Sequence, residues 1–407
     1  MTLPVKPSVP QVSLAALFRR FIGFGLLAWG GPVAQIGLMR RELVEQEHWI
    51  SSERFNRTLA VYQALPGPEA HELCVYFGYL ARGRIGGLLA GLGFMLPGLI
   101  LMMGLSWFYV NIGIISPFAL AFFAGAQAAV VALIVRAVHR IGAHALTDRW
   151  LGIISLLAAV ATVVGVHFAV VLLMAGVTYF LISRRVAPVA LAVLVATGVL
   201  TVMVALSGSG PSITAPDPGS AERAPAGSEA PVALLASGLK AGLLTFGGAY
   251  TAIPFLEADA VERDWMTSRT FLDGVALSGI LPAPFIIFAT FVGYVAGGPV
   301  GGLAITAGVF GPAFAFTLVG HRQLEQLVEN RSIHALLDGI TAGVVGLIAA
   351  TAVLLMPVAV RSAFGAAIFA VALASQYLWR SGRTGAAAVL GSGMVAVSLY
   401  SAFGFAP

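Results

Sequence analysis

The sequence predicts an all-α integral membrane protein, with about thirteen transmembrane helices in two inverted-topology repeats that contain broken helices. Three observations predict this fold class: an apolar composition, a regular series of apolar segments and an internal repeat. Of the 407 residues, 58% are hydrophobic and only 10% are charged, and the mean hydropathy is +0.92. A soluble domain has about 25% charged residues. The composition therefore excludes a soluble enzyme, a disordered chain and, with Cys74 as the one cysteine, a disulfide scaffold.

Seven apolar segments fill the N-terminal half, and each approaches the roughly 20 residues that a membrane helix needs. They lie at about 14–38, 54–80, 85–110, 117–136, 150–166, 168–183 and 187–206. The residues before them lack the cleavage site of a secretory signal, so we expect a cytoplasmic tail that leads into the first helix. We therefore predict residues 1–206 to form an N-terminal repeat of about seven spans.

A polar stretch, residues 207–230, separates the two halves. It is rich in Gly, Ser, Pro and Ala, which is typical of a flexible linker. Six more apolar segments follow, at about 231–257, 270–296, 300–319, 333–355, 357–376 and 384–403. Residues 231–407 are therefore predicted to form a C-terminal repeat of about six spans.

The basic residues predict the orientation in the membrane. With the N-terminus in the cytoplasm, the inner loops hold sixteen Lys and Arg and the outer loops hold six. An excess of positive charge on the inner side supports this orientation. The net charge of +5 is explained by topology in this way, so we expect no nucleic-acid partner.

Matched segments recur in the two halves at an offset that drifts only from 217 to 214. Copy one and copy two pair as follows: 24–36 with 241–253, 48–51 with 264–267, LPGP (65–68) with LPAP (281–284), 77–98 with 292–313, and 126–134 with 340–348. An odd number of spans precedes copy two, so it should enter the membrane with opposite polarity. The loops agree, because Arg82 and Arg84 of copy one are replaced by the uncharged residues 297–299. Inverted repeats with broken helices are typical of secondary transporters.

Each copy contains two motifs that should break a helix. Copy one has Gly30-Gly31-Pro32 and LPGP, and copy two has Gly247-Gly248 and LPAP. A half-helix that begins at such a break directs free N–H groups into a cavity, where two of them could hold a small anion. Kinks or close helix packing are the alternative, but recurrence in both copies favours a substrate site. The candidate substrate-binding residues are Gly30, Gly31, Pro32, Gln63, Pro66, Gly67, Pro68, Lys240, Gly247, Gly248, Pro282, Ala283 and Pro284.

Few polar residues lie within the predicted spans. Lys240 could compensate an anion or extend toward the interface, and Gln63 could bind an oxyanion or another helix. Glu69, His71 and Glu72 follow LPGP directly. They are candidates for proton coupling, with the alternative that they satisfy the helix dipole.

Several arginines lie at the ends of the spans. Arg40 and Arg41 could attract a dianion to the mouth of the site, although four nearby glutamates allow the alternative of a neutral solvated loop. Arg136 could serve an inner vestibule or anchor the topology. No catalytic, metal or nucleotide motif is present, so we expect no enzyme, metal or cofactor, and energy from an ion gradient or a partner.

Three segments of copy one carry a family resemblance. They are FIGFGLLAWGGP (21–32), HWIS (48–51) with the pattern from Phe55 to Pro68, and YFGYLARGRIGGLLAGLGFMLPG (76–98). With these, the chain resembles the chromate ion transporter family in its long, two-domain form. Copy two has the weaker form FGGAYTAIPFLE (246–257). The methyl group of Ala283 would crowd an anion, so the two half-sites are expected to be unequal.

The resemblance implies a multi-pass transporter of the bacterial-type cytoplasmic (inner) membrane that exports chromate and confers chromate resistance. Transport would use alternating access and be driven by the proton gradient or the membrane potential. The expected partners are chromate or sulfate and the lipid bilayer, and a homodimer is left open. The alternatives are a carrier of sulfate or another tetrahedral oxyanion, and a membrane-embedded sensor or reductase, which the single cysteine disfavours.

Overall fold

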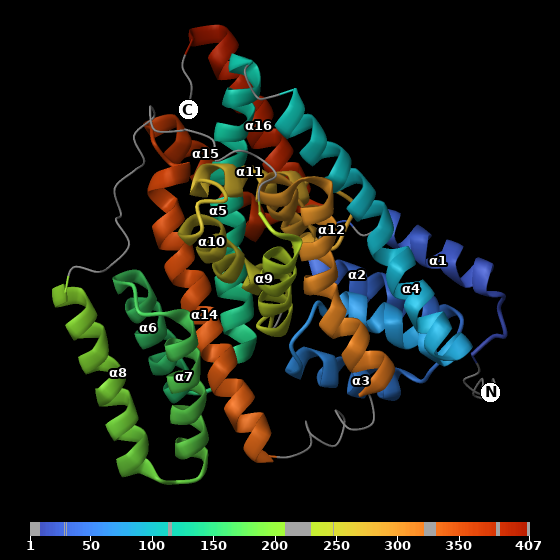
Figure 1. Ribbon diagram of the computed structural model, residues 1–407, viewed down its shortest axis with the longest axis horizontal. Helices are drawn as coiled ribbons and strands as arrows, with labels where there is room; N and C mark the ends of the chain where they lie inside the picture. Colours follow the sequence, from blue (N-terminus) through green and yellow to red (C-terminus); the bar gives the residue numbers. More distant parts are fainter. Residues whose placement is uncertain are drawn as a thin grey trace.

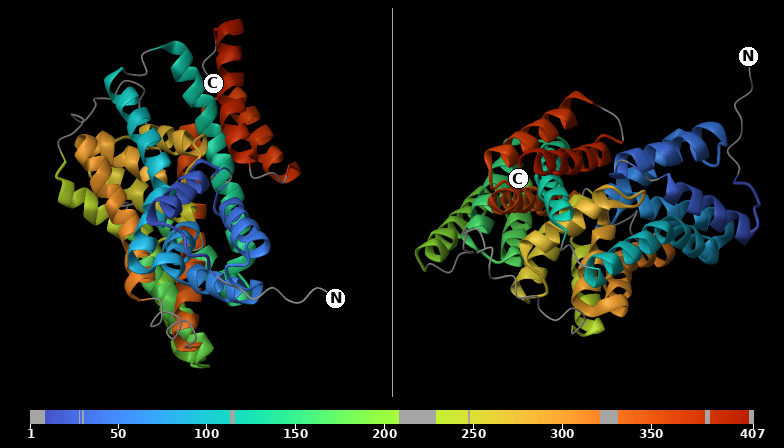
Figure 2. Two further views of the ribbon diagram at one scale, coloured as in Figure 1. Left: turned by 90° about the vertical axis from the view of Figure 1, so that its right-hand side faces the viewer. Right: turned by 90° about the horizontal axis from the view of Figure 1, so that it is seen from above.

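The computed structural model describes residues 9–27, 29, 31–112, 116–207, 229–246, 248–320, 331–379 and 383–404, and these ranges contain helices and no strand. The helices of copy one, α1 to α4, lie at one side of the molecule, and α6 to α8 lie at the other (Figure 1). The C-terminal helices α15 and α16 pack against α5, as Figure 2 also shows. The observed class is therefore all-α, as predicted.

The first half contains nine helical elements in the described ranges. These are α1 (Leu14–Leu26), α2 (Gly31–Met39), the π-helical turn η1 (Arg40–Gln46), α3 (Ser52–Ala64), α4 (Glu69–Asn111), α5 (Pro117–Ala145), α6 (Arg149–Val164), α7 (Phe168–Ser183) and α8 (Ala187–Ser207). The second half contains α9 (Pro231–Leu243), η2 (Ala249–Ala252), α10 (Ile253–Glu262), α11 (Ser268–Gly279), η3 (Phe285–Ile287), α12 (Phe288–Val319), α14 (Arg331–Ala359), α15 (Ala363–Leu378) and α16 (Thr384–Phe403).

Six helices of the described chain are long and apolar enough to cross a membrane, and four shorter apolar helices accompany them. The thirteen predicted segments do not correspond one-to-one to helices. Four of them, at 14–38, 54–80, 231–257 and 270–296, are each divided between separate helical elements. The divisions fall at the glycine and proline motifs, because these residues leave helical geometry or lack a backbone donor.

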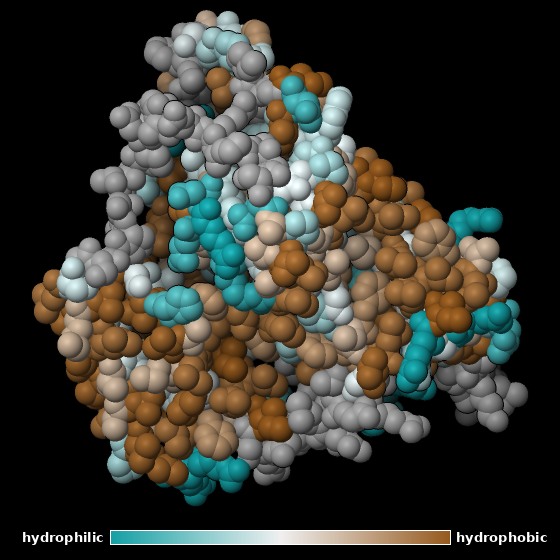
Figure 3. Space-filling view, in the orientation of Figure 1, coloured by the Kyte–Doolittle hydropathy of each residue, from teal (hydrophilic) through white to brown (hydrophobic). Residues whose placement is uncertain are grey.

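The surface of the molecule is apolar over broad areas. In Figure 3, hydrophobic side chains cover most of the visible face, and hydrophilic ones gather in a few clusters. Large apolar side chains are largely exposed at the ends of three helices, with Leu206 at 82%, Val319 at 72% and Leu378 at 78% exposure. Lipid tails are the solvent that accommodates such a surface.

The long helices α4 and α12 each turn back on themselves at one matched pair of residues. In α4, Arg82 has φ −145° and ψ 31°, and Gly83 has φ 61° and ψ −154°. In α12, Gly297 has φ −134° and ψ 19°, and Gly298 has φ 64° and ψ −160°. A positive φ with extended ψ is accessible essentially to glycine alone. Each copy therefore contains a short helix that follows its LP motif and a longer helix that packs beside it.

The first helix of each copy packs on this longer helix through the same contacts. A Cβ added to Gly25 would collide with the carbonyl of Phe94, and one added to Gly242 would collide with the carbonyl of Val309. These pairs occupy matched positions, since 25 corresponds to 242 and 94 to 309. Close approach through glycine is a common way for membrane helices to associate, and the repeat preserves it.

The two copies also touch each other through exchanged positions. A Cβ on Gly87 of copy one would lie 2.6 Å from Leu318 of copy two. A Cβ on Gly302, the counterpart of Gly87, would lie 2.9 Å from Met103, the counterpart of Leu318. A contact in which each partner takes the other's role is what a two-fold relation produces.

Candidate functional site

The broken segments of the two copies meet in the interior. The N–H of Gly67, in LPGP, donates to the carbonyl of Thr245 at 2.8 Å, just before the break of copy two. In return, Gln35 Nε2 donates to the carbonyl of Ala283, in LPAP, at 3.2 Å. Pro32 packs near Gly248, where a Cβ would lie 3.9 Å from the proline ring. The motifs that the sequence singled out are therefore neighbours in space, although they come from both halves of the chain.

Gly67 fills a position that other residues would strain. Its φ is +152°, and a Cβ there would lie 2.7 Å from Oε1 of Glu72. Gly248 also has a positive φ, +119°. The matched residue in LPAP, Ala283, directs its side chain against copy one, because a Cβ on Gly98 would collide with the Ala283 methyl group. The methyl group is therefore used in packing between the copies.

Glu72, like its neighbour His71, is a buried side chain whose polar atoms lack a hydrogen-bond partner among the described residues. The side chain of Glu72 is fully buried, and neither carboxylate oxygen has a hydrogen-bond partner in the part of the chain that the structure describes. A buried carboxylate without a partner costs several kcal/mol when ionised. Glu72 is therefore stable in this arrangement only when a proton or another cation neutralises it.

Glu69 lies one helical turn before Glu72 at the start of α4, and it is also buried. The side chain of Gln63 forms a hydrogen bond with its carboxylate. Pro66 and Pro68 flank Gly67 in the turn before α4. The structure thus brings Gln63, LPGP and the two glutamates together.

His71 lies in an aromatic environment between the copies. Its ring centroid is 4.9 Å from that of Phe310 and 4.7 Å from that of Phe314, both edge-on, and 6.5 Å from that of Phe94. The side chain is fully buried. This packing suits a neutral imidazole that joins α4 to α12, and it gives His71 a structural reason to be present.

Lys240 has an acidic partner away from these motifs. Its ammonium forms an ion pair with Asp259, which also accepts a hydrogen bond from Ser237 at 2.5 Å. The Nζ atom lies 4.8 Å from the ring centroid of Phe168. These contacts join α9 to α10 and α7. The charge of Lys240, a candidate for anion binding, is therefore neutralised by Asp259.

The arginine-rich segment that follows α2 is largely internally paired. Arg40 Nε lies 3.1 Å from Oε1 of Glu45, and its guanidinium lies over the ring of Phe55 at 5.8 Å. Arg41 is exposed. These contacts favour the alternative of a locally neutralised segment.

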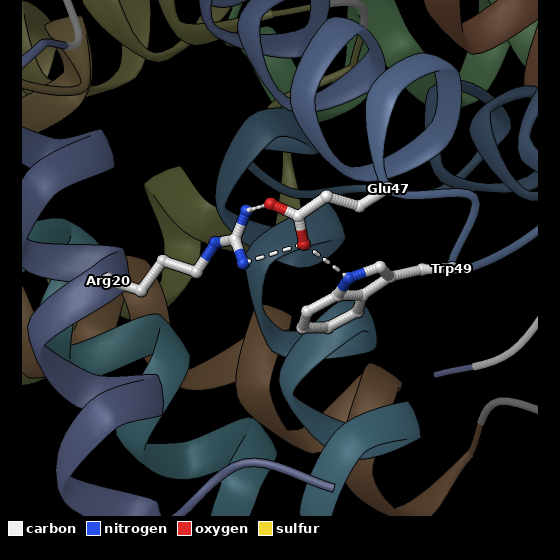
Figure 4. Close-up of polar contacts among 3 residues, drawn as sticks. All are labelled: Arg20, Glu47 and Trp49. Atoms are coloured by element: carbon white, nitrogen blue, oxygen red, sulfur yellow. Dashed lines mark hydrogen bonds and ion pairs between the residues drawn. The ribbon is translucent and has the colours of Figure 1, made fainter. Parts of the chain in front are cut away.

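A network of three side chains holds this segment against α1 (Figure 4). Arg20 donates to both carboxylate oxygens of Glu47, and Trp49 Nε1 donates to Glu47 Oε2 at 2.8 Å. The Arg20 guanidinium also lies 5.3 Å from the centroid of the Trp49 ring. The hydrogen bond from Arg20 holds the pKa of Glu47 below its ordinary value.

The other predicted residues fall in different places. Arg136 donates from Nε to the carbonyl of Gln376 at 3.3 Å and lies 4.5 Å from the ring centroid of Tyr377, so it fastens α5 to α15. Gly31 begins α2, and Pro282 and Pro284 flank Ala283. Gly30 and Gly247 lie outside the described residues.

Sequence reasoning missed Tyr250. Tyr250 lies in η2, two residues after Gly248, and its ring packs on that of Phe285 with centroids 4.4 Å apart. The available signal was a polar aromatic residue in FGGAY where copy one has Val33.

Comparison with known proteins agrees with the two-copy organisation. The model of the chromate transporter family matches the chain twice, over residues 15–181 and again over residues 232–397. The chain belongs to the chromate transporter family. It is 54% identical over 389 residues to the chromate transport protein of Pseudomonas aeruginosa, which covers 95% of this chain and 92% of the relative. No solved structure matches it.

More distant relatives also align over most of the chain. A chromate transport protein of Cupriavidus metallidurans is 31% identical over 351 residues, covering 86% of this chain and 84% of the relative. An uncharacterized transporter of Methanocaldococcus jannaschii is 27% identical over 362 residues, covering 83% of each. With these relatives and its long apolar helices, the chain is a multi-pass membrane transport protein and not an enzyme.

Proposed function

We propose that the protein exports chromate from a bacterial-type cell across the cytoplasmic membrane and so confers chromate resistance. The single observation that carries this proposal is the family match over both halves, with relatives that are named chromate transport proteins. The N-terminus lies in the cytoplasm in this proposal, as the distribution of basic residues favours.

Alternating access is the mechanism that the internal repeat supports. Residues 1–206 and 231–407 act as two repeats of opposite polarity, joined by the linker 207–230. The exchanged contacts of Gly87 and Gly302 are consistent with a two-fold relation between them. Rocking of one repeat against the other would expose a central site to each side in turn.

The central site lies at the four broken segments. The helix N-termini at these segments supply positive potential for a tetrahedral dianion. Gly31, Gly67 and Gly248 let the backbone approach the anion closely, while prolines fix the turns. Replacing Gly67 with valine therefore abolishes chromate resistance while the protein still reaches the membrane, and unchanged resistance would refute this site.

Two energy sources fit a dianion. A membrane potential of 100 mV supplies about 2.3 kcal/mol per charge, and thus about 4.6 kcal/mol for export of a dianion from a negative interior. Glu72 and Glu69 are candidate proton-binding groups at the site. Burial raises the free energy of the ionised carboxylates there, which favours binding of a proton. A proton bound at Glu72 would make transport depend on the pH gradient as well as on the potential.

Inside-out membrane vesicles test direction, substrate and energy source together. In such vesicles export becomes uptake, and a lumen-positive potential should drive chromate into the lumen. Vesicles without the protein are the control, and the chromium in the lumen should remain hexavalent. Uptake no greater than in the control would refute the proposal, and reduced chromium would favour a reductase.

Sulfate is the second candidate substrate because it is also a tetrahedral dianion. Excess sulfate should compete with chromate uptake in the same vesicles. Stronger transport of sulfate than of chromate, at equal concentrations, would make this a general oxyanion carrier. Whether the transporter works as a homodimer is settled by its mass in detergent or nanodiscs.

A further inference from the structure

A buried cluster of polar side chains joins the two copies away from the glycine and proline motifs. Asp273, in α11, accepts a hydrogen bond from the Tyr109 hydroxyl at Oδ2 and another from Gln127 Nε2 at Oδ1, both at 2.7 Å. Gln127 Nε2 also lies 3.5 Å from the carbonyl oxygen of Arg269, one turn earlier in α11. Asp273 and Gln127 are only 5% and 2% exposed. Both carboxylate oxygens of Asp273 are therefore held by donors inside the protein.

The cluster crosses the boundary between the copies. Tyr109 lies near the end of α4, and Gln127 lies in the part of α5 that matches residues 340–348, so both donors belong to copy one. Asp273 belongs to copy two. The Tyr109 ring packs at the same boundary, with its centroid 4.9 Å from that of Phe291 in α12. A movement that takes α11 away from α4 and α5 therefore separates Asp273 from its donors.

The Asp273 carboxylate depends on these two donors. No Lys, Arg or His in the part of the chain that the structure describes lies within ion-pair distance of it. An ionised carboxylate that loses its hydrogen bonds inside the protein is costly, whereas water can replace the lost donors. Opening of the cluster and entry of water at this boundary are therefore expected to occur together.

The matched positions elsewhere in the repeat are used differently. Arg57 of α3 occupies the place of Asp273, and it is exposed and pairs with Glu53 of its own helix at 3.8 Å. Thr341 of α14 occupies the place of Gln127, and its hydroxyl donates to a carbonyl of its own helix at 2.8 Å. Both matched side chains thus bond within their own helices. The fold of the repeat therefore does not require the link between copies.

We propose that Asp273, Tyr109 and Gln127 form a latch that holds α11 of copy two against α4 and α5 of copy one, and that opens and closes once in each transport cycle. The inference rests on the proposed alternating access, in which the two ends of the molecule open in turn. It adds the side chains that close one end. A latch made of hydrogen bonds suits this task, because water can satisfy the same groups in the open state.

The test measures the access of water to a cysteine placed beside the latch. Ser106 is fully buried one turn before Tyr109 in α4, and its hydroxyl donates to the carbonyl of Met102 in the same helix at 2.7 Å. Ser106→Cys therefore replaces one atom at a covered position. A water-soluble maleimide is applied to the full-length protein in nanodiscs, where it reaches both faces. The same proteins without Ser106→Cys give the background from the buried Cys74.

Two substitutions weaken the latch with little change in shape. Tyr109→Phe removes one oxygen atom and keeps the ring in its aromatic contacts, and Asp273→Asn removes the charge. Each should raise the labelling rate about tenfold, since loss of a hydrogen bond to a carboxylate shifts a two-state equilibrium by about that factor. Tyr400→Phe and Asp264→Asn are matched controls outside the cluster, and both should label at the wild-type rate.

A latch also predicts labelling that depends on turnover. In liposomes, the Ser106→Cys protein should label faster while a membrane potential drives chromate uptake than it does at rest. With Tyr109→Phe added, labelling should be fast in both conditions. A contact that serves only stability would lower the melting temperature of Tyr109→Phe and leave the labelling of the folded protein unchanged.

The outcomes separate this inference from the proposed function. Faster labelling of Tyr109→Phe and Asp273→Asn, with normal controls and labelling that increases during uptake, supports the latch. Wild-type labelling rates in both variants, or equal labelling at rest and during uptake, overturn it and leave chromate transport standing. Absence of chromate uptake by the wild-type protein overturns the proposed function, and the transport role of the latch falls with it.

Discussion

The two repeat copies share a backbone but differ in chemistry at the start of the helix that follows each LP motif. Copy one continues from LPGP with Glu69, His71 and Glu72, whereas copy two continues from LPAP with Phe285 and Phe288 at the places of the two glutamates. Both helices then turn back at matched residues with nearly equal dihedral angles. The fold therefore does not require the acidic side chains, which makes function the better explanation for a buried carboxylate such as Glu72.

The same contrast recurs at the matched turns of residues 48–51 and 264–267. His48 and Asp264 both have φ of 53°, so both copies make the same left-handed turn. Trp49 then donates to Glu47, whereas Trp265 Nε1 is buried with no hydrogen-bond partner among the described residues. Geometry is preserved between the copies, and polar pairing is not.

The largest effect is expected from exchanging the central residues of LPGP and LPAP. Gly67→Ala puts a methyl group 2.7 Å from the Glu72 carboxylate at a φ of +152°, so chromate resistance should fall more than tenfold. Ala283→Gly gives copy two the sequence of copy one and should leave most of the resistance. Growth in chromate, normalised to the amount of protein in the membrane, measures both. Equal losses in the two variants would mean that the copies are equivalent here.

A symmetric loss of stability is expected from the helix-packing glycines. Gly25→Leu and Gly242→Leu force side chains into matched close contacts and should each destabilise the protein by about 1–3 kcal/mol. Gly104→Leu is the control, because a Cβ there meets no atom within 4 Å. Thermal unfolding in detergent measures the three variants. A large loss in one copy only would break the structural equivalence of the repeats.

At Glu72 we expect a substitution that raises the stability of the fold and lowers the dependence of transport on the pH gradient. Glu72→Leu replaces a buried, unpartnered carboxyl by an apolar side chain, as copy two does with Phe288, and should stabilise the fold by about 1–2 kcal/mol. The same variant should lose the response of transport to the pH gradient. A clear fall in melting temperature would show that Glu72 has a structural partner instead.

The smallest effect is expected from the network of Arg20, Glu47 and Trp49. The pKa of Glu47 is lowered in the folded protein. The network therefore stabilises the folded state at pH values above 4.5, the ordinary pKa of a glutamate, and this contribution is lost as the pH falls through the lowered pKa of the folded protein. Both partners are partly exposed, so the contribution is about 0.5–1 kcal/mol. Unfolding of Glu47→Gln and wild type should differ at pH 7, and the difference should shrink as the pH falls below 4.5. A difference that does not shrink at acid pH would mean that the carboxylate charge is not responsible.

Much of the fold could be predicted from the sequence, because membrane helices and helix breaks depend on local composition. The apolar segments predicted the helices, and the recurring glycine and proline motifs predicted where the helices are interrupted. The predicted gaps between the segments 54–80 and 85–110 and between 270–296 and 300–319 correspond to the turns at Gly83 and Gly298. The sequence could not show how closely the helices on either side of each turn pack, because that packing depends on tertiary contacts. The sequence also placed Lys240 among the candidates for anion binding. Its ion pair with Asp259 could not be predicted, because it depends on how α9 packs on α10.

The site was predictable only in part, for a related reason. LPGP and its glutamates are contiguous in the sequence, so they could be recognised together. The hydrogen bonds from Gly67 to Thr245 and from Gln35 to Ala283 join residues from distant parts of the chain. Such contacts leave no periodic pattern in a single sequence.

The central claim is that copy one carries a proton-binding carboxylate in a frame that both copies share. The most direct test is chromate uptake into inside-out vesicles, with a pH gradient imposed at zero potential and a potential imposed at zero pH gradient, for wild type and Glu72→Gln. Wild-type uptake should change with both gradients, whereas Glu72→Gln should respond to the potential and ignore the pH gradient. An equal response of both proteins to the pH gradient would contradict the claim.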